Sequence, residues 1–452
     1  MGKNKKGKRH SSDMQGIGTL TDCSAAVLLH RTGNLNEAKR IYQGILAARP
    51  DHVEALHFVG VLYHQLGQSD RGVASIQRAI LLAPDYADAY NNLGNVFKET
   101  NQLKPALQAY LQVVELLPGH ADAWNNLGVI LRAQGQYEQA DKAYAHALSL
   151  NPTLVAAWQN RGNLLVRMNR FDEAITAFVR VLELRPQDMA AFDALGRTLY
   201  RFGKVDQAIQ VYEKWLRADP ANSVAQHMLA ACSGAASPSR ASDDYVRSIF
   251  DVFAVSFDQV LDQLGYRAPA LIGELLDRNL KPPDASLVIV DAGCGTGLCA
   301  DFLRPRAKQL IGVDLSPGML TKARARNTYD QLIEAELTSW LASQHPVFDL
   351  IVSADTLCYF GSLETVFMHA QSAMKPGGFL AFTVELSEGC ERGYQLNPNG
   401  RYSHTERYVR EGLSATGLKL LAIEQVDLRR ELGQVVRGQL VWAQRIASTA
   451  IF

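Results

Sequence analysis

Residues 287–297 read LVIVDAGCGTG, an apolar run that leads directly into a glycine-rich turn. The apolar run is typical of a buried β-strand, and the next stretch, CADFLRPRA (residues 299–307), favours a helix. Glycines let a backbone turn tightly and let a ligand approach closely, and the start of a helix presents free N–H groups. This stretch therefore predicts a strand, a ligand-binding turn and a helix, in that order.

Short runs rich in β-branched residues recur through the second half of the chain. They are KQLIGVDL (308–315), FDLIVSAD (348–355) and GGFLAFTVE (377–385), and segments that favour helices separate them. Strands that alternate with helices predict an open α/β sheet of mostly parallel strands, which binds ligands at the carboxyl ends of those strands. LKLLAIEQVDL (418–428) and VVRGQLVWAQ (435–444) predict the last two strands, the second of them an antiparallel insertion at the edge.

The spacing of the glycines narrows the choice of cofactor. A dinucleotide-binding turn has glycine or alanine where this chain has Leu298, so the G-x-G-x-x-G pattern is incomplete. The spacing is G-x-G-x-G instead, and DAGCGTG (291–297) resembles the first motif of class I S-adenosylmethionine-dependent methyltransferases. The next predicted strand ends in Asp314, 17 residues after Gly297, where a carboxylate can accept both ribose hydroxyls or can cap a helix.

Four further segments resemble the same family in the same order. They are LSPGMLTKARAR (315–326) after the acid, IEAELTSWL (333–341) at the adenine ring, VFDLIVSADTLCYF (347–360) as the fourth strand, and KPGGFLAF (375–382) at the start of the fifth. The resemblance implies a Rossmann-like α/β domain with a seven-stranded mixed sheet and S-adenosylmethionine as its cofactor. The residues that we expect to bind the cofactor are Asp291, Gly293, Gly295, Thr296, Gly297, Asp314, Leu315, Met319, Glu336, Leu337, Ala354 and Asp355.

Methyl transfer from a sulfonium needs no nucleophile from the protein, because the cofactor carries the reactivity and the protein aligns the acceptor. An acceptor hydroxyl or ammonium must first lose a proton, whereas a carboxylate needs little acid–base help. The candidate catalytic residues are Tyr359, just past the fourth predicted strand, and His404 in RYSHTERY (401–408). The alternatives are a packing aromatic for Tyr359 and a surface-loop histidine for His404. Asp355 could orient the substrate or act through its backbone.

The first half of the chain repeats every 34 residues. Prolines recur at Pro50, Pro84, Pro118, Pro152, Pro186 and Pro220, and glycines at Gly60, Gly94, Gly128, Gly162 and Gly196. With alanines and aromatics in the same register, the pattern resembles the tetratricopeptide repeat. It predicts an all-α superhelix over residues 21–232, made of six antiparallel helix pairs and a capping helix, in which proline ends each second helix. The second pair, which has Gly72 and Ile76 in place of the alanine and the aromatic, matches least well.

Three asparagines occupy equivalent positions two residues before a repeat glycine: Asn92, Asn126 and Asn160. An amide can both donate and accept hydrogen bonds. The arrangement resembles the asparagine ladder of the O-linked N-acetylglucosamine transferase superhelix, which implies that these side chains bind an extended protein or peptide in the repeat groove. The alternative is that they support local helix packing without a ligand.

Composition shifts mark the expected domain boundaries. The first ten residues, MGKNKKGKRH, predict a disordered basic tail over residues 1–20, and SGAASPSRAS (233–242) has the composition of a linker. The predicted methyltransferase domain spans residues 243–452 and opens with an amphipathic stretch, DDYVRSIFDVFAVSFDQVLDQL (243–264). The whole arrangement resembles the bacterial group of repeat-containing predicted methyltransferases.

Charge and cysteine usage exclude several classes of function. Lys plus Arg and Asp plus Glu both number 46, with 20 of each in residues 21–232 and 20 basic against 25 acidic residues in residues 241–452, which disfavours a nucleic acid partner. The six cysteines form no C-x-x-C pair, so we expect no metal site and a reducing cytoplasm. No apolar run is long enough to span a membrane. Three hypotheses remain: a methyltransferase acting on a protein captured by the repeats, a small-molecule methyltransferase docked by them, and a scaffold with a regulatory cofactor domain.

Overall fold

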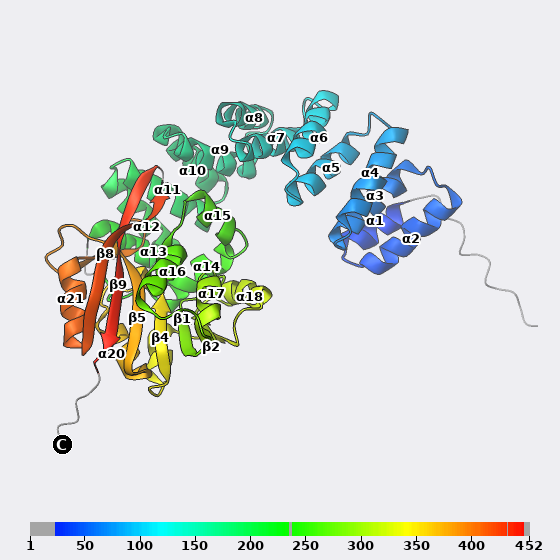
Figure 1. The fold of residues 1–452 in the computed structure, drawn as a ribbon. Helices are drawn as coiled ribbons and strands as arrows, with labels where there is room; N and C mark the ends of the chain where they lie inside the picture. The colour runs from blue at the N-terminus through cyan, green and yellow to red at the C-terminus, as the bar shows by residue number, and fades with distance from the viewer. Residues whose placement is uncertain (1–22, 235–236, 432, 447–452) are drawn as a thin grey trace, which may run out of the picture. The chain divides into compact units, whose positions relative to one another are not determined.

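The computed structural model describes residues 23–234, 237–431 and 433–446 (Figure 1). The predicted basic tail, residues 1–20, lies outside this range. The chain divides into two compact units, Met1–Pro186 and Gln187–Phe452.

The described part of the first unit is a run of five antiparallel helix pairs, coloured blue to green in Figure 1. The helices are α1 (Ser24–Arg31), α2 (Leu35–Ala48), α3 (Val53–Gln65), α4 (Ser69–Leu82), α5 (Ala87–Glu99), α6 (Leu103–Leu116), α7 (Ala121–Ala133), α8 (Tyr137–Leu150), α9 (Val155–Arg167) and α10 (Phe171–Leu184). Each second helix ends two residues before its repeat proline, because a proline has no N–H to continue the hydrogen-bond ladder. The predicted all-helical repeat array is confirmed.

The repeat glycines bring the two helices of each pair into close contact. A Cβ added at Gly94 would lie 2.9 Å from the Tyr110 ring, and one at Gly128 would lie 2.6 Å from the Tyr144 ring. In the second pair, α3 and α4, the close approach of the helices depends on a second glycine. A Cβ on Gly72 would lie 2.7 Å from the carbonyl oxygen of Gly60. Two glycines therefore replace the usual glycine and alanine where the two helices meet.

The second unit begins with the sixth helix pair and the cap: α11 (Met189–Arg201), α12 (Val205–Ala218) and α13 (Ser223–Ser233). These helices belong to the same compact unit as the α/β domain. The boundary between the two units therefore lies one repeat before the end of the repeat array that the sequence motif indicates. The expected linker also packs on that domain: the N–H of Ala241 donates to the Tyr359 carbonyl (2.8 Å), and the Tyr402 hydroxyl donates to the Pro238 carbonyl (2.8 Å).

A nine-stranded mixed sheet forms the centre of the second unit. Its strands are β1 (Leu287–Ala292), β2 (Ala307–Asp314), β3 (Gln331–Glu334), β4 (Phe348–Ser353), β5 (Met374–Leu386), β6 (Tyr394–Leu396), β7 (Tyr402–His404), β8 (Leu418–Glu431) and β9 (Gln434–Arg445). The five strands β3-β2-β1-β4-β5 are parallel, and β9 runs antiparallel between β5 and β8, as predicted. Seven strands were expected; the short β6–β7 hairpin, which pairs with the end of β5, adds two.

Helices cover both faces of the sheet. They are α14 (Asp243–Phe253), α15 (Phe257–Gln263), α16 (Ala268–Asn279), α17 (Ala300–Leu303), α18 (Pro317–Arg326), α19 (Leu337–Ala342), α20 (Glu364–Ala373) and α21 (Glu406–Ala415). On β1, Ile289 belongs to the apolar cluster that contains α16, and Val290 to the cluster that contains α20 and α21. Alternate residues of one strand thus face opposite layers, which is the arrangement that doubly covered parallel strands require.

Candidate active site

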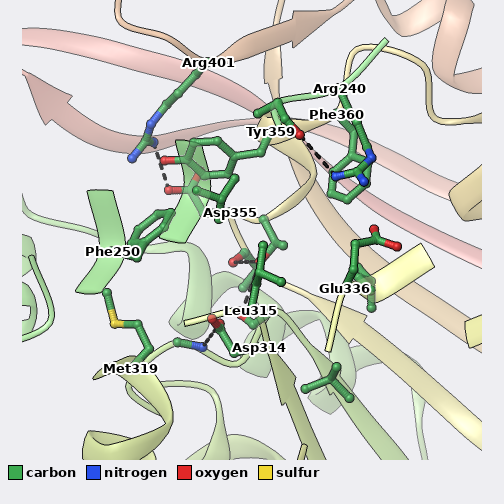
Figure 2. Close-up of a pocket in the computed structure, with 18 of the residues that line it drawn as sticks. Arg240, Phe250, Asp314, Leu315, Met319, Glu336, Asp355, Tyr359, Phe360 and Arg401 are labelled. Carbon is green, nitrogen blue, oxygen red and sulfur yellow. Dashed lines mark hydrogen bonds and ion pairs between the residues drawn. The ribbon is translucent and has the colours of Figure 1, made fainter. Parts of the chain in front are cut away.

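A pocket lies at the carboxyl ends of the parallel strands (Figure 2). Nine of the twelve residues that we expected to bind the cofactor line it: Gly293, Gly295, Asp314, Leu315, Met319, Glu336, Leu337, Ala354 and Asp355. The candidate acceptor-side residue Tyr359 lines it too, together with Arg240, Ala241, Val246, Phe250, Phe257, Leu261, Tyr266, Val313, Ala335, Thr356, Phe360 and Arg401. Residues from the carboxyl ends of four strands, β1, β2, β3 and β4, therefore meet at one place.

The glycine turn after β1 depends on left-handed backbone geometry. Gly293 has φ +80°, Gly295 has φ +54° and Gly297 has φ +89°, which side chains with a Cβ rarely adopt. A Cβ on Gly293 would lie 2.1 Å from Thr356 Oγ1, whereas one on Gly295 would meet only the Phe257 ring at 4.0 Å. Gly293 is thus needed for packing within the protein, and the space beside Gly295 is open to a ligand.

Asp314 ties the end of β2 to the glycine turn. Its Oδ2 accepts from the Gly295 N–H (2.8 Å) and its Oδ1 accepts from the Ser316 N–H (2.9 Å). Burial raises the pKa of Asp314, while these backbone hydrogen bonds act to lower it. Each carboxylate oxygen has further lone pairs, so the side chain can still accept hydrogen bonds from a ligand's hydroxyls.

Glu336 caps α19 and lines the pocket beside Leu337. Its carboxylate accepts from the N–H groups of Thr338 (3.0 Å) and Ser339 (2.7 Å). Burial acts to raise the pKa of Glu336, but the hydrogen bonds from α19 lower it below its ordinary value. An anionic oxygen is thus held at the pocket wall.

Three expected cofactor residues lie behind the pocket instead of lining it. Asp291 is buried and accepts from the Tyr329 hydroxyl (2.6 Å), and burial raises its pKa to about 7. Thr296 Oγ1 donates to Asp258 Oδ1 (2.5 Å). A Cβ on Gly297 would lie 3.1 Å from the Tyr329 ring. Their contacts shape the turn from within the protein.

Helices α14 and α15, which we call the covering helices, close one side of the pocket. Asp251 of α14 accepts from Ser316 Oγ (2.5 Å) and from the Gly318 N–H (3.2 Å), just after the β2 acid. Asp258 of α15 accepts from Thr296 and, at 2.7 Å, from Arg326. The sequence pattern indicated amphipathic helices here, but nothing in it assigned these two carboxylates to the cofactor loops.

Aromatic and charged side chains form a further side of the pocket. The Tyr359 ring is nearly buried and meets the edge of Phe250, with ring centroids 5.4 Å apart. The Arg401 guanidinium carbon lies 5.7 Å from the centre of the Tyr359 ring. Burial raises the pKa of the Tyr359 phenol, so the phenol stays neutral near pH 7. Figure 2 shows Tyr359, Asp355 and Arg401 grouped on this side.

Asp355 is held by two arginines that sequence reasoning missed. It has φ +55°, and its carboxylate pairs with Arg401 Nη1 (3.1 Å) and with Arg429 Nη1 (3.2 Å). Both arginines also pair with the buried Glu385. Arg401 comes from the β6–β7 hairpin and Arg429 from β8, far along the chain from the motifs, so no local spacing could have indicated them.

His404 lies elsewhere. It is fully buried on β7, its Nε2 donates to the Gly361 carbonyl (3.0 Å), and it is not among the residues that line the pocket. Burial lowers its pKa to about 4. Neither acceptor-side chemistry nor a surface loop describes this position, because the β6–β7 hairpin turns the ring into the protein.

The three repeat asparagines lie on the first helices of consecutive pairs and are half-buried. The Asn92 amide donates to His57 Nε2 (2.7 Å) of the preceding pair, and the Asn160 amide donates to Asn125 Oδ1 (3.0 Å) of the preceding pair. Asn126 has the equivalent place on α7. Two of these amides therefore join neighbouring repeats.

Comparison with known proteins assigns both halves of the chain. Residues 9–250, more than half of it, match the family model described as "Cilia and flagella-associated protein 70 C-terminal domain". The chain belongs to this family. Within this member, residues 290–382 match the model described as "Methyltransferase domain". The repeat array is followed by a class I methyltransferase domain, and domains of this class use S-adenosylmethionine.

Several curated methyltransferases are similar to part of this family member. Methyltransferase-like protein 27 of Homo sapiens is 38% identical over 140 residues, 30% of this chain and 57% of that protein. Trans-aconitate 2-methyltransferase of Paracidovorax citrulli (strain AAC00-1) is 29% identical over 140 residues, 30% of this chain and 48% of that protein. The chain thus spans about half the length of these curated relatives.

Among solved structures, that of Pseudomonas aeruginosa pilF covers 46% of this chain and 95% of its own chain, with 18% identity and a TM-score of 0.41. A crystal structure of MamA covers 36% of this chain and 94% of its own, with 27% identity and a TM-score of 0.34. In the part of the chain that the structure describes, no helix combines the length and apolar character needed to cross a bilayer.

Proposed function

We propose that this protein transfers a methyl group from S-adenosylmethionine to an acceptor on a protein or peptide that the repeat array recruits. The observation that carries the proposal is the pocket in which the glycine turn, Asp314 and Glu336 meet at the strand ends. The space beside Gly295 suits a ligand that has a ribose and an adenine ring. The carboxylates of Asp314 and Glu336, which already accept backbone hydrogen bonds, can accept further hydrogen bonds from such a ligand.

The residues of the pocket divide the work. Asp314 would accept the ribose hydroxyls, Glu336 and Leu337 would border the adenine, and Ala354 and Asp355 would lie near the methionine part. When bound, the cofactor supplies a methyl group on a sulfonium, which is reactive without a protein nucleophile. Phe250, Phe257 and Tyr359 keep water from the reacting atoms and align the acceptor.

The chemical class of the acceptor has to come from the pocket, because the relatives are named for different substrates. They include Malonyl-[acyl-carrier protein] O-methyltransferase of Enterobacter lignolyticus (strain SCF1) and 18S rRNA (guanine-N(7))-methyltransferase of Bos taurus. The balanced charge of this chain speaks against a nucleic acid. A small-molecule acceptor remains the second candidate, because aromatic side chains enclose the acceptor side of the pocket.

Calorimetric titration of S-adenosylmethionine into the full chain tests the cofactor assignment. We expect saturable binding that Asp314→Ala weakens at least about tenfold, because hydrogen bonds to a charged group are each worth about 1.5–3 kcal/mol. Asp301→Ala, which removes an exposed carboxylate on α17, should bind as the wild type does. If the intact chain does not bind the cofactor, the enzyme assignment fails and the scaffold hypothesis replaces it.

Labelled methyl transfer tests the role of the repeats. With methyl-labelled S-adenosylmethionine and a cell extract, we expect label in the protein fraction, and less of it after Asn92, Asn126 and Asn160 are changed to alanine. A matched control changes three exposed glutamines on second helices, Gln77, Gln112 and Gln139, to alanine. Label confined to small molecules would favour the second candidate.

A further inference from the structure

Arg401 presents an incompletely used guanidinium to the pocket. It lines the pocket, its side chain is 20% exposed, and only Nη1 has partners among the described residues, Asp355 at 3.1 Å and Glu385 at 3.4 Å. A guanidinium carries five N–H donors in a rigid fork that matches a carboxylate. Nε and Nη2 of Arg401 are therefore free to bind a ligand.

Arg429 makes this possible because it shares the same two acids. Its side chain is fully buried, and it pairs with Asp355 at 3.2 Å and with Glu385. It also holds Glu431 at 2.7 Å, on the outer side of the cluster. Asp355 and Glu385 thus have a counter-ion besides Arg401, and Arg401 can accept a further anion without leaving either acid unpaired.

Apart from Arg401, the charged side chains that line the pocket are already engaged. Asp314 and Glu336 accept hydrogen bonds from backbone N–H groups, and Asp355 is bound by two guanidinium groups. The phenol of Tyr359 is neutral, since burial raises its pKa. The guanidinium of Arg240 pairs with Asp243 at 2.6 Å. None of these groups is placed as a free base that could take a proton from the acceptor. The pocket therefore suits an acceptor that is nucleophilic without losing a proton.

We propose that the acceptor is a carboxylate, that Arg401 binds it, and that the product is a methyl ester; this rests on the function proposed above. One carboxylate oxygen forms a bond to the methyl carbon, the carbon–sulfur bond breaks, and its electron pair stays on sulfur. No proton moves. Because Phe250, Tyr359 and Phe360 border the acceptor side, the carboxylate is carried on an apolar group.

A binding experiment tests the role of Arg401 without turnover. Phenylacetate and its uncharged analogue phenylacetamide are titrated by calorimetry into the full chain saturated with S-adenosylhomocysteine. We expect the wild type to bind the carboxylate at least about tenfold more tightly than the amide, as charge-assisted hydrogen bonds allow. Arg401→Gln should remove this preference and still bind S-adenosylhomocysteine, because Asp355 keeps Arg429 as its counter-ion. Arg407→Gln, on an exposed arginine of α21, should keep the preference. Equal binding of acid and amide by the wild type overturns the proposal.

The chemistry of the product gives the second readout. Methyl label transferred into a cell extract is treated with mild base, which releases methanol from methyl esters and leaves N-, C- and ether-linked methyl groups in place. We expect volatile label, from the protein fraction if the acid is a side chain and from the small-molecule fraction if it is free. Base-stable label overturns the carboxylate acceptor but keeps the methyltransferase assignment, whereas failure to bind S-adenosylhomocysteine overturns both.

Discussion

Gly293 shows how strictly one residue can be fixed by its surroundings. It combines φ +80° with a Cβ direction that Thr356 already fills. We expect Gly293→Ala to weaken S-adenosylmethionine binding at least about tenfold, because the left-handed region costs a residue with a Cβ roughly 1–2 kcal/mol and the clash adds to it. Gly389→Ala, which has open space around it, is the matched control in the same calorimetric titration. Normal affinity in Gly293→Ala would show that the turn can move without cost.

The buried His404 makes the free energy of unfolding depend on pH. Burial lowers its pKa from 6.5 to about 4, so the unfolded chain takes up a proton more readily, and stability that is present above pH 6.5 is lost as the pH falls toward 4. At pH 5 this corresponds to about 2 kcal/mol. We expect His404→Gln to lose correspondingly less stability than the wild type between pH 7.5 and pH 5 in urea unfolding. His345→Gln, at an exposed position, should behave as the wild type does.

Site residues that belong to a sequence motif could be predicted, whereas those that reach the pocket from distant parts of the chain could not. Asp314 could be predicted because an acid at the end of the second strand follows the glycine turn at a fixed spacing. Arg401 could not, since it reaches the pocket from a hairpin 46 residues after Asp355. His404 was chosen for its chemistry, but the same hairpin carries its ring into the interior.

Among the elements, the covering helices α14 and α15 are hydrogen-bonded directly to the cofactor loops. They bring Asp251 to the segment after β2 and Asp258 to the glycine turn. We expect bound S-adenosylhomocysteine to slow amide hydrogen exchange over residues 243–263, and Asp258→Asn to reduce that protection because its bond to Arg326 loses its charge. Asp262→Asn, on an exposed position of α15, should leave it unchanged. Protection that is equal in both variants would contradict the role of Asp258.

The elements that the sequence predicted are those with a strong apolar period. The strands β1, β2, β4 and β5 each contain a short apolar run, and the repeat helices carry a 34-residue pattern. The strands β6 and β7 have three residues each, pair with each other, and join the rest of the sheet only where β7 pairs with the end of β5. Such a hairpin has no period of its own, and tertiary contacts decide that it forms.

For the whole molecule, the contacts place the last helix pair and the cap with the α/β domain. His227 of α13 donates to the Gly400 carbonyl (2.9 Å), Arg197 of α11 donates to the Asn399 carbonyl (3.3 Å), and the His227 ring stacks on Tyr245 at 3.9 Å. A repeat motif shows where the helices end but not which of them share a core. The sequence could therefore place the end of the array, and the structure places the division between the two units.

Two truncations distinguish these boundaries. We expect residues 187–452 to unfold in one transition, and residues 243–452 to melt at least about 5 °C lower, because a loss of 1 kcal/mol lowers the Tm of a 150–250-residue domain by about 2–4 °C. The shorter chain loses the stacking partner of Tyr245 and exposes Tyr402, both nearly fully buried. Differential scanning calorimetry makes the comparison. Equal melting temperatures would mean that α11–α13 contribute no stability to the domain.

The loop that carries Arg401 is held to α11 and α13 through its neighbours Asn399 and Gly400. This attachment limits which repeats can be added to the chain or removed from it. Whole 34-residue units can be gained or lost among the first five helix pairs, where each unit meets only others of its own kind. The sixth cannot be exchanged so freely, because replacing it alters the support of an arginine in the pocket. We expect natural and engineered variants of this architecture to differ in the number of upstream repeats while keeping the final one.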